Sequence, residues 1–183
     1  LVGNKMEAGG AGIFLGPGHA DISVEGVRFE GCFHDVRVKG ETGPVTRRVA
    51  VRNCTSVEAA GTSIFFNWEC VDCLVRDCWI IKPVENGVWA GNTSERVEVA
   101  GCHIIESGRI GVECTVSGAE ANVHDNFISG NGYAPDATKP IGFVLPTSKA
   151  SLQNQPDPDI IYDGIIDPAY AADAGVAQLD PKS

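Results

Sequence analysis

A four-residue block recurs every 24 residues along this chain. Its copies are Val51–Cys54, Val75–Cys78, Val99–Cys102 and Val123–Asn126. Apolar and polar residues alternate within and beyond the block, which is the period of a β-strand and not of a helix. A fixed period of this length predicts a solenoid, in which each repeat is one coil of short strands.

The third and fourth positions of the block have separate predicted roles. The third position holds residue types that tolerate a left-handed backbone, so we expect a tight bend there. These residues are Asn53, Asp77, Gly101 and Asp125. The fourth position points into the coil, where Cys54, Cys78 and Cys102 are predicted to act as small hydrophobic groups. Each repeat is therefore predicted to contain three short strands and their turns.

The remaining cysteines give little indication of a metal site or a disulfide bond. Cys70 and Cys73 have the spacing of a metal or disulfide pair and fall on a turn. One such pair without a second is a weak zinc signal. An odd total of seven cysteines, with no other pairing pattern, favours free thiols.

This pattern resembles the right-handed parallel β-helix of the pectate-lyase-like superfamily. The turn positions and the segment Asn126–Asn131 are similar to its generic repeats, and the resemblance covers residues 12 to 145. It implies an all-β solenoid of about six coils with 24-residue rungs. In that layout Val51 and Arg52 belong to the second strand of a coil, and Ile64–Phe66 to the first strand of the next. Such motifs specify a fold and leave the activity open.

Residues 1–145 are predicted to form the β-helix. Gly12–Leu15 matches Gly87–Ala90, so the chain opens in the middle of a coil. Solenoids need an atypical end unit, so we expect further N-terminal rungs or a cap, from a longer protein or from a neighbour.

Residues 146–183 are predicted to form an irregular tail. Seven of the ten prolines follow Gly132, and the 24-residue register ends after Val144. The apolar clusters Ile160–Tyr162 and Ile165–Ile166 argue against a solvated linker. We therefore expect this tail to pack on the coil or on a partner.

The composition narrows the range of partners. A net charge of −10 makes nucleic acid or an anionic membrane surface an unfavourable partner. No segment approaches the ~20 apolar residues of a membrane span, and no signal peptide is recognisable. The resemblance leaves a secreted or a virion-associated location open.

The candidate site follows from the resemblance, which implies a substrate groove along the outside of the first strand. The outward positions of that strand, read rung by rung, form one column: Phe14, Arg37, Phe65, Trp89 and Glu113. The next column includes Lys39 and Asn67, and the turns before the strand add a polar rim of His34, Asp35, Glu85 and Asn86. Rungs ~4.8 Å apart are close to the repeat of a sugar ring in an extended glycan. Phe65 and Trp89 are thus predicted to form a stacking platform for pyranose rings, with Asn67, His34 and Glu85 as further substrate-binding residues.

Two mechanisms are compatible with this column. A lyase or epimerase acting on a uronate would use Arg37 to neutralise the carboxylate and Lys39 as the base. A glycosidase needs two carboxylates, and the column offers only Glu113, with Glu85, Asp35 and Glu106 on turns. The lyase or epimerase is therefore favoured over the hydrolase. The superfamily's clustered calcium-binding aspartates have no counterpart, so no cofactor is predicted and calcium has no clear site.

Other interpretations of the same residues stay open. The proline-rich tail could cover Phe65 and Trp89, or these rings could lie in a subunit interface. A second aromatic pair, Trp79 and Phe127, is predicted to be exposed in a third-strand column. The members of this column are Arg28, Thr55, Trp79, His103 and Phe127. The leading hypothesis is a carbohydrate-active β-helix protein that binds or cleaves an extended polysaccharide. The alternative is a non-catalytic structural or adhesive module, such as part of a viral tail spike or surface fibre, in which a homotrimer or the N-terminal remainder of the protein covers these columns.

Overall fold

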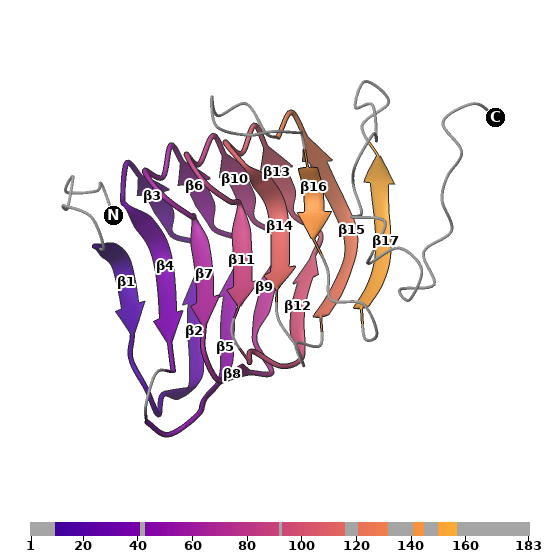
Figure 1. The fold of residues 1–183 in the computed structure, drawn as a ribbon. Helices are drawn as coiled ribbons and strands as arrows, with labels where there is room; N and C mark the ends of the chain where they lie inside the picture. The colour runs from indigo at the N-terminus through magenta and orange to yellow at the C-terminus, as the bar shows by residue number, and fades with distance from the viewer. Residues whose placement is uncertain are drawn as a thin grey trace.

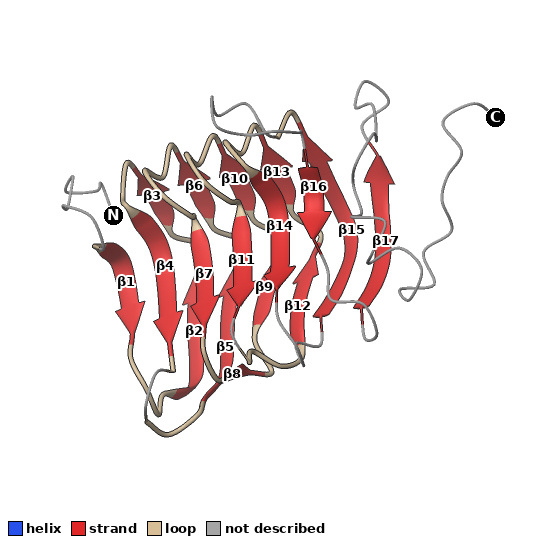
Figure 2. Cartoon of the chain, in the orientation of Figure 1, coloured by secondary structure: helices blue, strands red, loops and turns tan. Residues whose placement is uncertain are grey.

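The chain winds as a parallel β-solenoid, seen from the side in Figure 1. The structure, a computed structural model, describes residues 10–40, 43–91, 93–115, 121–131, 141–144 and 150–156. Within these ranges the secondary structure consists of strands joined by short loops, as Figure 2 shows. No helix in the described part could cross a membrane. The predicted all-β solenoid is therefore confirmed.

The first strands of successive coils form one parallel sheet, the front row in Figure 1. Its members are β1 (Ala11–Leu15), β4 (His34–Lys39), β7 (Ile64–Asn67), β11 (Val88–Gly91), β14 (Ile110–Thr115) and β16 (Ile141–Val144). Parallel pairing in register places equivalent residues of neighbouring coils side by side. This row is called the first-strand sheet below.

The second and third strands of the coils form the other sheet. The second strands are β2 (Ala20–Glu25), β5 (Thr46–Arg52), β9 (Leu74–Arg76), β12 (Val97–Ala100) and β15 (Ala121–Ser129). The third strands are β3 (Arg28–Glu30), β6 (Thr55–Val57), β10 (Trp79–Ile81) and β13 (His103–Ile105), and they meet the second strands through β15, which pairs with both β12 and β13. A short strand, β8 (Cys70–Val71), pairs with β5.

The bends between strands are made by columns of residues with a left-handed backbone. The predicted bend is confirmed, because Asn53, Asp77, Gly101 and Asp125 have φ of 51°, 54°, 63° and 56°. Two further columns of residues with positive φ were not predicted. One corner has Asp21, Arg48, Asp72 and Arg96, and another has Glu58, Lys82 and Glu106. Side-chain pairs between rungs accompany these bends: Arg48 Nε and Nη2 donate to the two Asp21 carboxylate oxygens at 2.6 and 2.8 Å.

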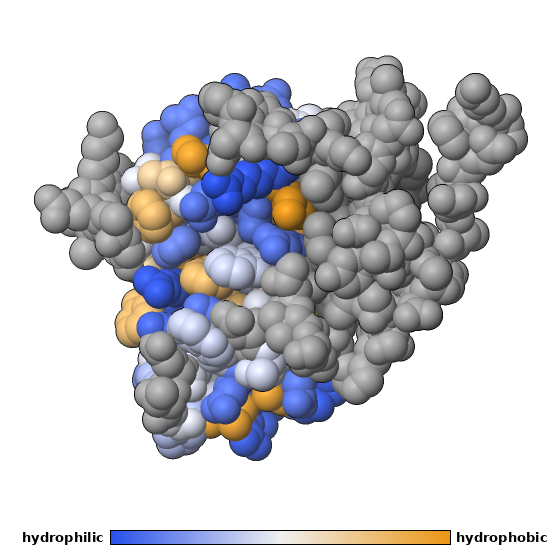
Figure 3. All heavy atoms as spheres, in the orientation of Figure 1, coloured by the Kyte–Doolittle hydropathy of each residue, from blue (hydrophilic) through white to orange (hydrophobic). Residues whose placement is uncertain are grey.

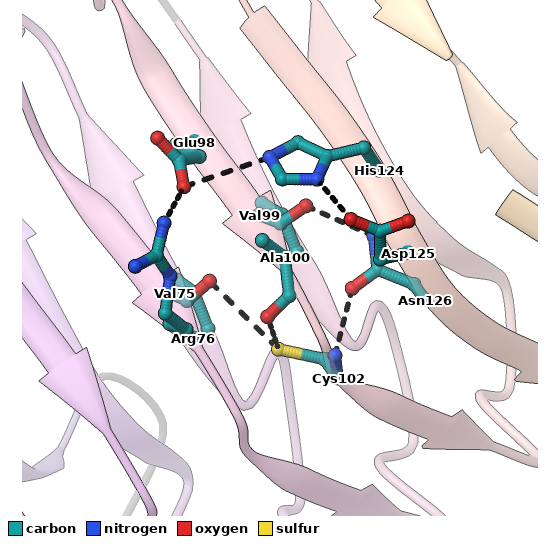
Figure 4. Close-up of polar contacts among 9 residues, drawn as sticks. All are labelled: Val75, Arg76, Glu98, Val99, Ala100, Cys102, His124, Asp125 and Asn126. Carbon is teal, nitrogen blue, oxygen red and sulfur yellow. Dashed lines mark hydrogen bonds and ion pairs between the residues drawn. The ribbon is translucent and has the colours of Figure 1, made fainter. Parts of the chain in front are cut away.

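The inward cysteine column is confirmed. Cys54, Cys78 and Cys102 are buried free thiols. Each lies close to a main-chain carbonyl of the preceding rung, as in the 3.7 Å contact between Cys78 Sγ and Val51 O. The column ends at Asn126, whose amide accepts from Cys102 N and donates to Val99 O, both at 2.9 Å (Figure 4).

Cys70 and Cys73 are also buried free thiols, as predicted. Burial raises the pKa of Cys70 to about 12 and that of Cys73 to about 11. Thiols with such high pKa values carry almost no thiolate at neutral pH, so they are poor nucleophiles.

The later rungs change their spacing. Val112 pairs with Phe143, and Ala121 pairs with Ala150, so these pairs no longer keep the interval of 24 residues. The strand β17 (Ala150–Pro156) lies in the segment predicted to be irregular, and it adds a parallel strand beside β15. A search at a fixed period cannot find such a strand. The predicted packing of the rest of the tail concerns residues outside the described ones.

Replacing Cys78 tests the inward register. Cys78→Asp would place an unpaired charge between two rungs without solvent, so we expect the coil not to fold. Cys78→Val keeps a small apolar group and should cost about 1 kcal/mol or less in the free energy of unfolding. Circular dichroism during heating measures both. A folded Cys78→Asp variant with an unchanged melting temperature would contradict the register.

Candidate functional site

The outward residues of the first-strand sheet form the predicted row. Strand pairing aligns Phe14 with Arg37, Arg37 with Phe65, Phe65 with Trp89, and Trp89 with Glu113. The second column is confirmed where Lys39 pairs with Asn67. The register of these columns is thus confirmed, while their role in binding stays a prediction. These five aligned residues are called the first-strand row.

The rings of the row stack on each other. Phe65 and Trp89 are parallel within 6°, with ring centroids 4.4 Å apart. The guanidinium carbon of Arg37 lies 5.7 Å from the Phe65 centroid, on the neighbouring rung, and 6.0 Å from that of Phe14. Phe65 is only 5% exposed. Its faces are therefore occupied by Trp89 and Arg37, in a stacked pair and a cation–π contact.

This geometry corrects the predicted stacking platform. Because Phe65 and Trp89 lie on adjacent rungs, face-to-face stacking directs the ring normals along the coil axis. The two rings therefore cannot lie side by side with their faces open to sugar rings. A ligand running along the row would meet ring edges, the half-buried Trp89 indole and the polar groups beside it.

Gly91 makes room for the Trp89 indole. A Cβ atom at position 91 would lie 3.0 Å from Trp89 Nε1 and 3.1 Å from Cε2. Contacts this tight would shift the indole by a few tenths of an ångström, so glycine lets the indole lie close to the strand. Gly91 thus positions the indole on which Phe65 stacks.

His34 lies beneath the row and supports Phe65. It is buried, its ring lies 5.3 Å from Phe65 and 4.8 Å from Phe33, and its Nδ1 donates to the Thr62 carbonyl at 2.7 Å. Burial lowers the pKa of His34, so the neutral ring is favoured. The structure therefore places this predicted substrate-binding residue as a support for the rings.

Two carboxylates lie at the predicted rim. Glu113 Oε2 accepts from Asn86 Nδ2 at 2.6 Å, and Glu85 Oε2 accepts from Thr62 Oγ1 at 3.2 Å. Asn86 also accepts from the main-chain N–H of Ile110 at 3.2 Å, which fixes the orientation of its amide. Both carboxylates are half-buried and tied by neutral donors to neighbouring rungs.

Arg37 of the row and Lys39 of the second column both lie against aromatic rings. Lys39 Nζ is 5.0 Å from the centroid of Trp68, which follows the buried Asn67 on the turn after β7. Trp68 was not among the predicted site residues, because it lies on a turn and has no equivalent in the strand columns. Its position directly after the predicted site residue Asn67 is the sequence feature that could have identified it.

Asp35 does not lie on the rim, so its predicted position was wrong. Its side chain is fully buried, and its Oδ2 lies 2.8 Å from Ser63 Oγ, which is 2.7 Å from Ser56 Oγ. Asp35 and Val36 are both buried although they are consecutive residues of β4, so strict alternation fails there. Burial raises the pKa of Asp35 to about 6.

Glu106 is also remote from the row. It forms an ion pair with Lys82 at 3.3 Å, at the corner after the third strand. Of the carboxylates considered as a second acid beside Glu113, only Glu85 lies at the rim of the row.

A second polar cluster lies on the outer face of the second strands (Figure 4). His124 Nδ1 is 2.7 Å from Asp125 Oδ2, and its Nε2 is 3.6 Å from Glu98 Oε1, which also accepts from Arg76. Both ring nitrogens face carboxylates of this chain, so neither is directed at a substrate. The cluster is best described as an exposed charge network between rungs, which contributes little to stability.

The described residues contain no group of three or more His, Cys, Asp or Glu side chains arranged to hold a metal ion.

One protein-family model matches most of the chain. A family model described as a right-handed β-helix region matches residues 1–139. The chain belongs to this family. No curated protein matches this chain, and no solved structure matches it. The matched range contains the whole first-strand row, and the family description concerns the fold and not an activity.

Asp35 makes the stability of the β-helix depend on pH. Since its pKa in the folded state is above the ordinary value of 3.8, its protonation stabilises the fold, and that contribution is lost as the pH rises through about 6. Asp35→Asn removes the buried charge, so it should stabilise the protein at pH 8 by up to about 3 kcal/mol and change little at pH 4.

Chemical denaturation at pH 4, 6 and 8 measures this difference. Glu30→Gln, which removes an exposed carboxylate, is the matched control and should show no such trend. A difference between Asp35→Asn and the wild type that stays constant from pH 4 to pH 8 would contradict a buried, protonated Asp35.

Proposed function

We propose that this β-helix binds an extended polysaccharide along the first-strand row and acts on it there. The observation that carries the proposal is the row itself, in which a cation, two stacked rings and a carboxylate occupy successive rungs. Rungs ~4.8 Å apart allow consecutive sugar units to meet consecutive rungs. A linear ligand lying along the coil axis would therefore contact the whole row.

The surface of the row supports a polar ligand. Figure 3 looks onto the first-strand sheet, and its described atoms show hydrophilic residues mixed with paler and hydrophobic ones. Large hydrophobic patches are typical of protein interfaces, whereas sugar sites combine rings with hydrogen-bonding groups. Arg37 and Lys39, both half-buried, offer donors to a sugar carboxylate or to hydroxyls, and Glu113 offers an acceptor.

Elimination or epimerisation is the chemistry favoured for this site. Arg37 and Lys39 project from the same side of β4, two residues apart. Arg37 would neutralise the carboxylate of a uronate, and Lys39 would take the proton from the adjacent carbon. In the elimination, the electron pair of the broken C–H bond forms the carbon–carbon double bond, the glycosidic C–O bond breaks, and the leaving oxygen takes a proton from solvent.

A panel of acidic and neutral polysaccharides tests this proposal. The readouts are release of reducing ends, ultraviolet absorbance of unsaturated products, and affinity by calorimetry. We expect Arg37→Ala to abolish product formation. Trp89→Ala should weaken binding about tenfold, since a ring contact contributes about 1.4 kcal/mol.

The matched control is Trp79→Ala, which removes an exposed tryptophan from the third-strand side and should leave affinity unchanged. Product loss in Glu113→Gln with activity retained in Lys39→Ala would favour hydrolysis over elimination. Neither binding nor product across the panel, together with a single sharp oligomer in solution, would contradict the proposal and favour a structural module.

A further inference from the structure

The outer side of the third strands carries an apolar surface distinct from the first-strand row. Strand pairing aligns two outward columns there, rung by rung. The members that make up this surface, called the third-strand face, are Val57, Trp79, Ile81, His103, Ile105 and Phe127. Trp79 is 47% exposed, and the others are half-buried. The same two columns also contain Thr55 and Ser129, and at the N-terminal end of the coil they continue to Arg28 and Glu30.

The rings of this face form a ladder that stops at Trp79. Trp79 and His103 are parallel within 1° at a centroid distance of 4.1 Å, and His103 lies 5.7 Å from Phe127. On its other side Trp79 pairs with Thr55, which has no ring. One indole face is therefore left without a stacking partner on the neighbouring rung. An apolar sheet face of this kind is usually covered by another apolar segment.

The last described strand ends beside this face. The last residues of β17 pair with the third-strand part of β15, Gln155 with Phe127 and Pro156 with Ile128. Figure 1 shows β17 next to β15 at the C-terminal end of the solenoid. The residues that follow Pro156 therefore begin one strand away from Phe127.

The sequence after Pro156 has the composition of a covering segment. Residues 157–167 contain five large apolar residues, Ile160, Ile161, Tyr162, Ile165 and Ile166, separated by aspartates. Pro158 disfavours a helical conformation at Asp157 and favours an extended chain. An extended chain gains ~3.3 Å per residue, and the three rungs from Phe127 to Val57 cover ~14 Å, so about five residues reach across the face.

We propose that residues 157–167 dock on the third-strand face. Their isoleucines and Tyr162 lie against Trp79, Ile81 and Ile105, while their aspartates stay in solvent. Tyr162 supplies the ring that the ladder lacks beside Trp79. In this arrangement the C-terminal segment closes the apolar side of the coil and leaves the first-strand row open.

Fluorine NMR on the full chain labelled with 5-fluorotryptophan tests this docking. The three resonances are assigned with Trp68→Phe, Trp79→Phe and Trp89→Phe. We expect a small solvent-isotope shift at Trp79 in the wild type. The double variant Ile160→Asp/Ile161→Asp should move the Trp79 resonance and enlarge this shift at least twofold, without moving Trp68 or Trp89. Ile165→Asp/Ile166→Asp is a second variant with the same expectation, and Ala171→Asp/Ala172→Asp is the matched control, which should change nothing.

Three results would overturn the proposal. A shift at Trp89 instead of Trp79 would place the segment on the first-strand row. No change at any tryptophan would show that the segment does not touch the coil. A Trp79 resonance that moves with protein concentration would assign the third-strand face to a second copy of the chain.

Discussion

The whole structure depends on parallel hydrogen bonding between coils that keep their register. Each strand pairs with its equivalent one coil earlier and one coil later, so one residue position becomes a column along the axis. A column that points inwards must hold side chains that stack without voids, which is why small thiols recur at Cys54, Cys78 and Cys102. A column that points outwards becomes a surface with a repeat of ~4.8 Å.

The same stacking limits what the outward columns can bind. Aromatic residues on adjacent rungs come close enough to stack on each other, as Phe65 does with Trp89 and Trp79 with His103. Each stacked pair rigidifies its sheet, and it also takes ring faces away from external ligands. Under the proposed function, recognition along the first-strand sheet would therefore rest on Arg37, Lys39, Glu113 and the ring edges.

Periodicity predicted the columns and could not predict how side chains are oriented in them. The bend at Asn53 and Asp77 followed from residue type, whereas the bend through Arg48 did not, because arginine has no preference for a left-handed backbone. Asp35 was predicted on the rim as a residue of the turn before the strand, whereas it lies within β4 and its side chain is buried. The spacing predicted that Phe65 and Trp89 lie on adjacent rungs, but it could not predict that their rings stack face to face. β17 was not predicted because its spacing from β15 differs from 24 residues.

The register of the outward columns is the central claim, because the site follows from the first-strand columns and the docking proposal from the third-strand columns. Nuclear Overhauser effects between aromatic side chains measure it directly in solution. The register predicts strong effects between the ring protons of Phe65 and Trp89, whose centroids lie 4.4 Å apart, and between those of Trp79 and His103. If these effects were missing while each ring showed contacts to residues of other columns, the rungs would be paired differently and the first-strand row would not exist.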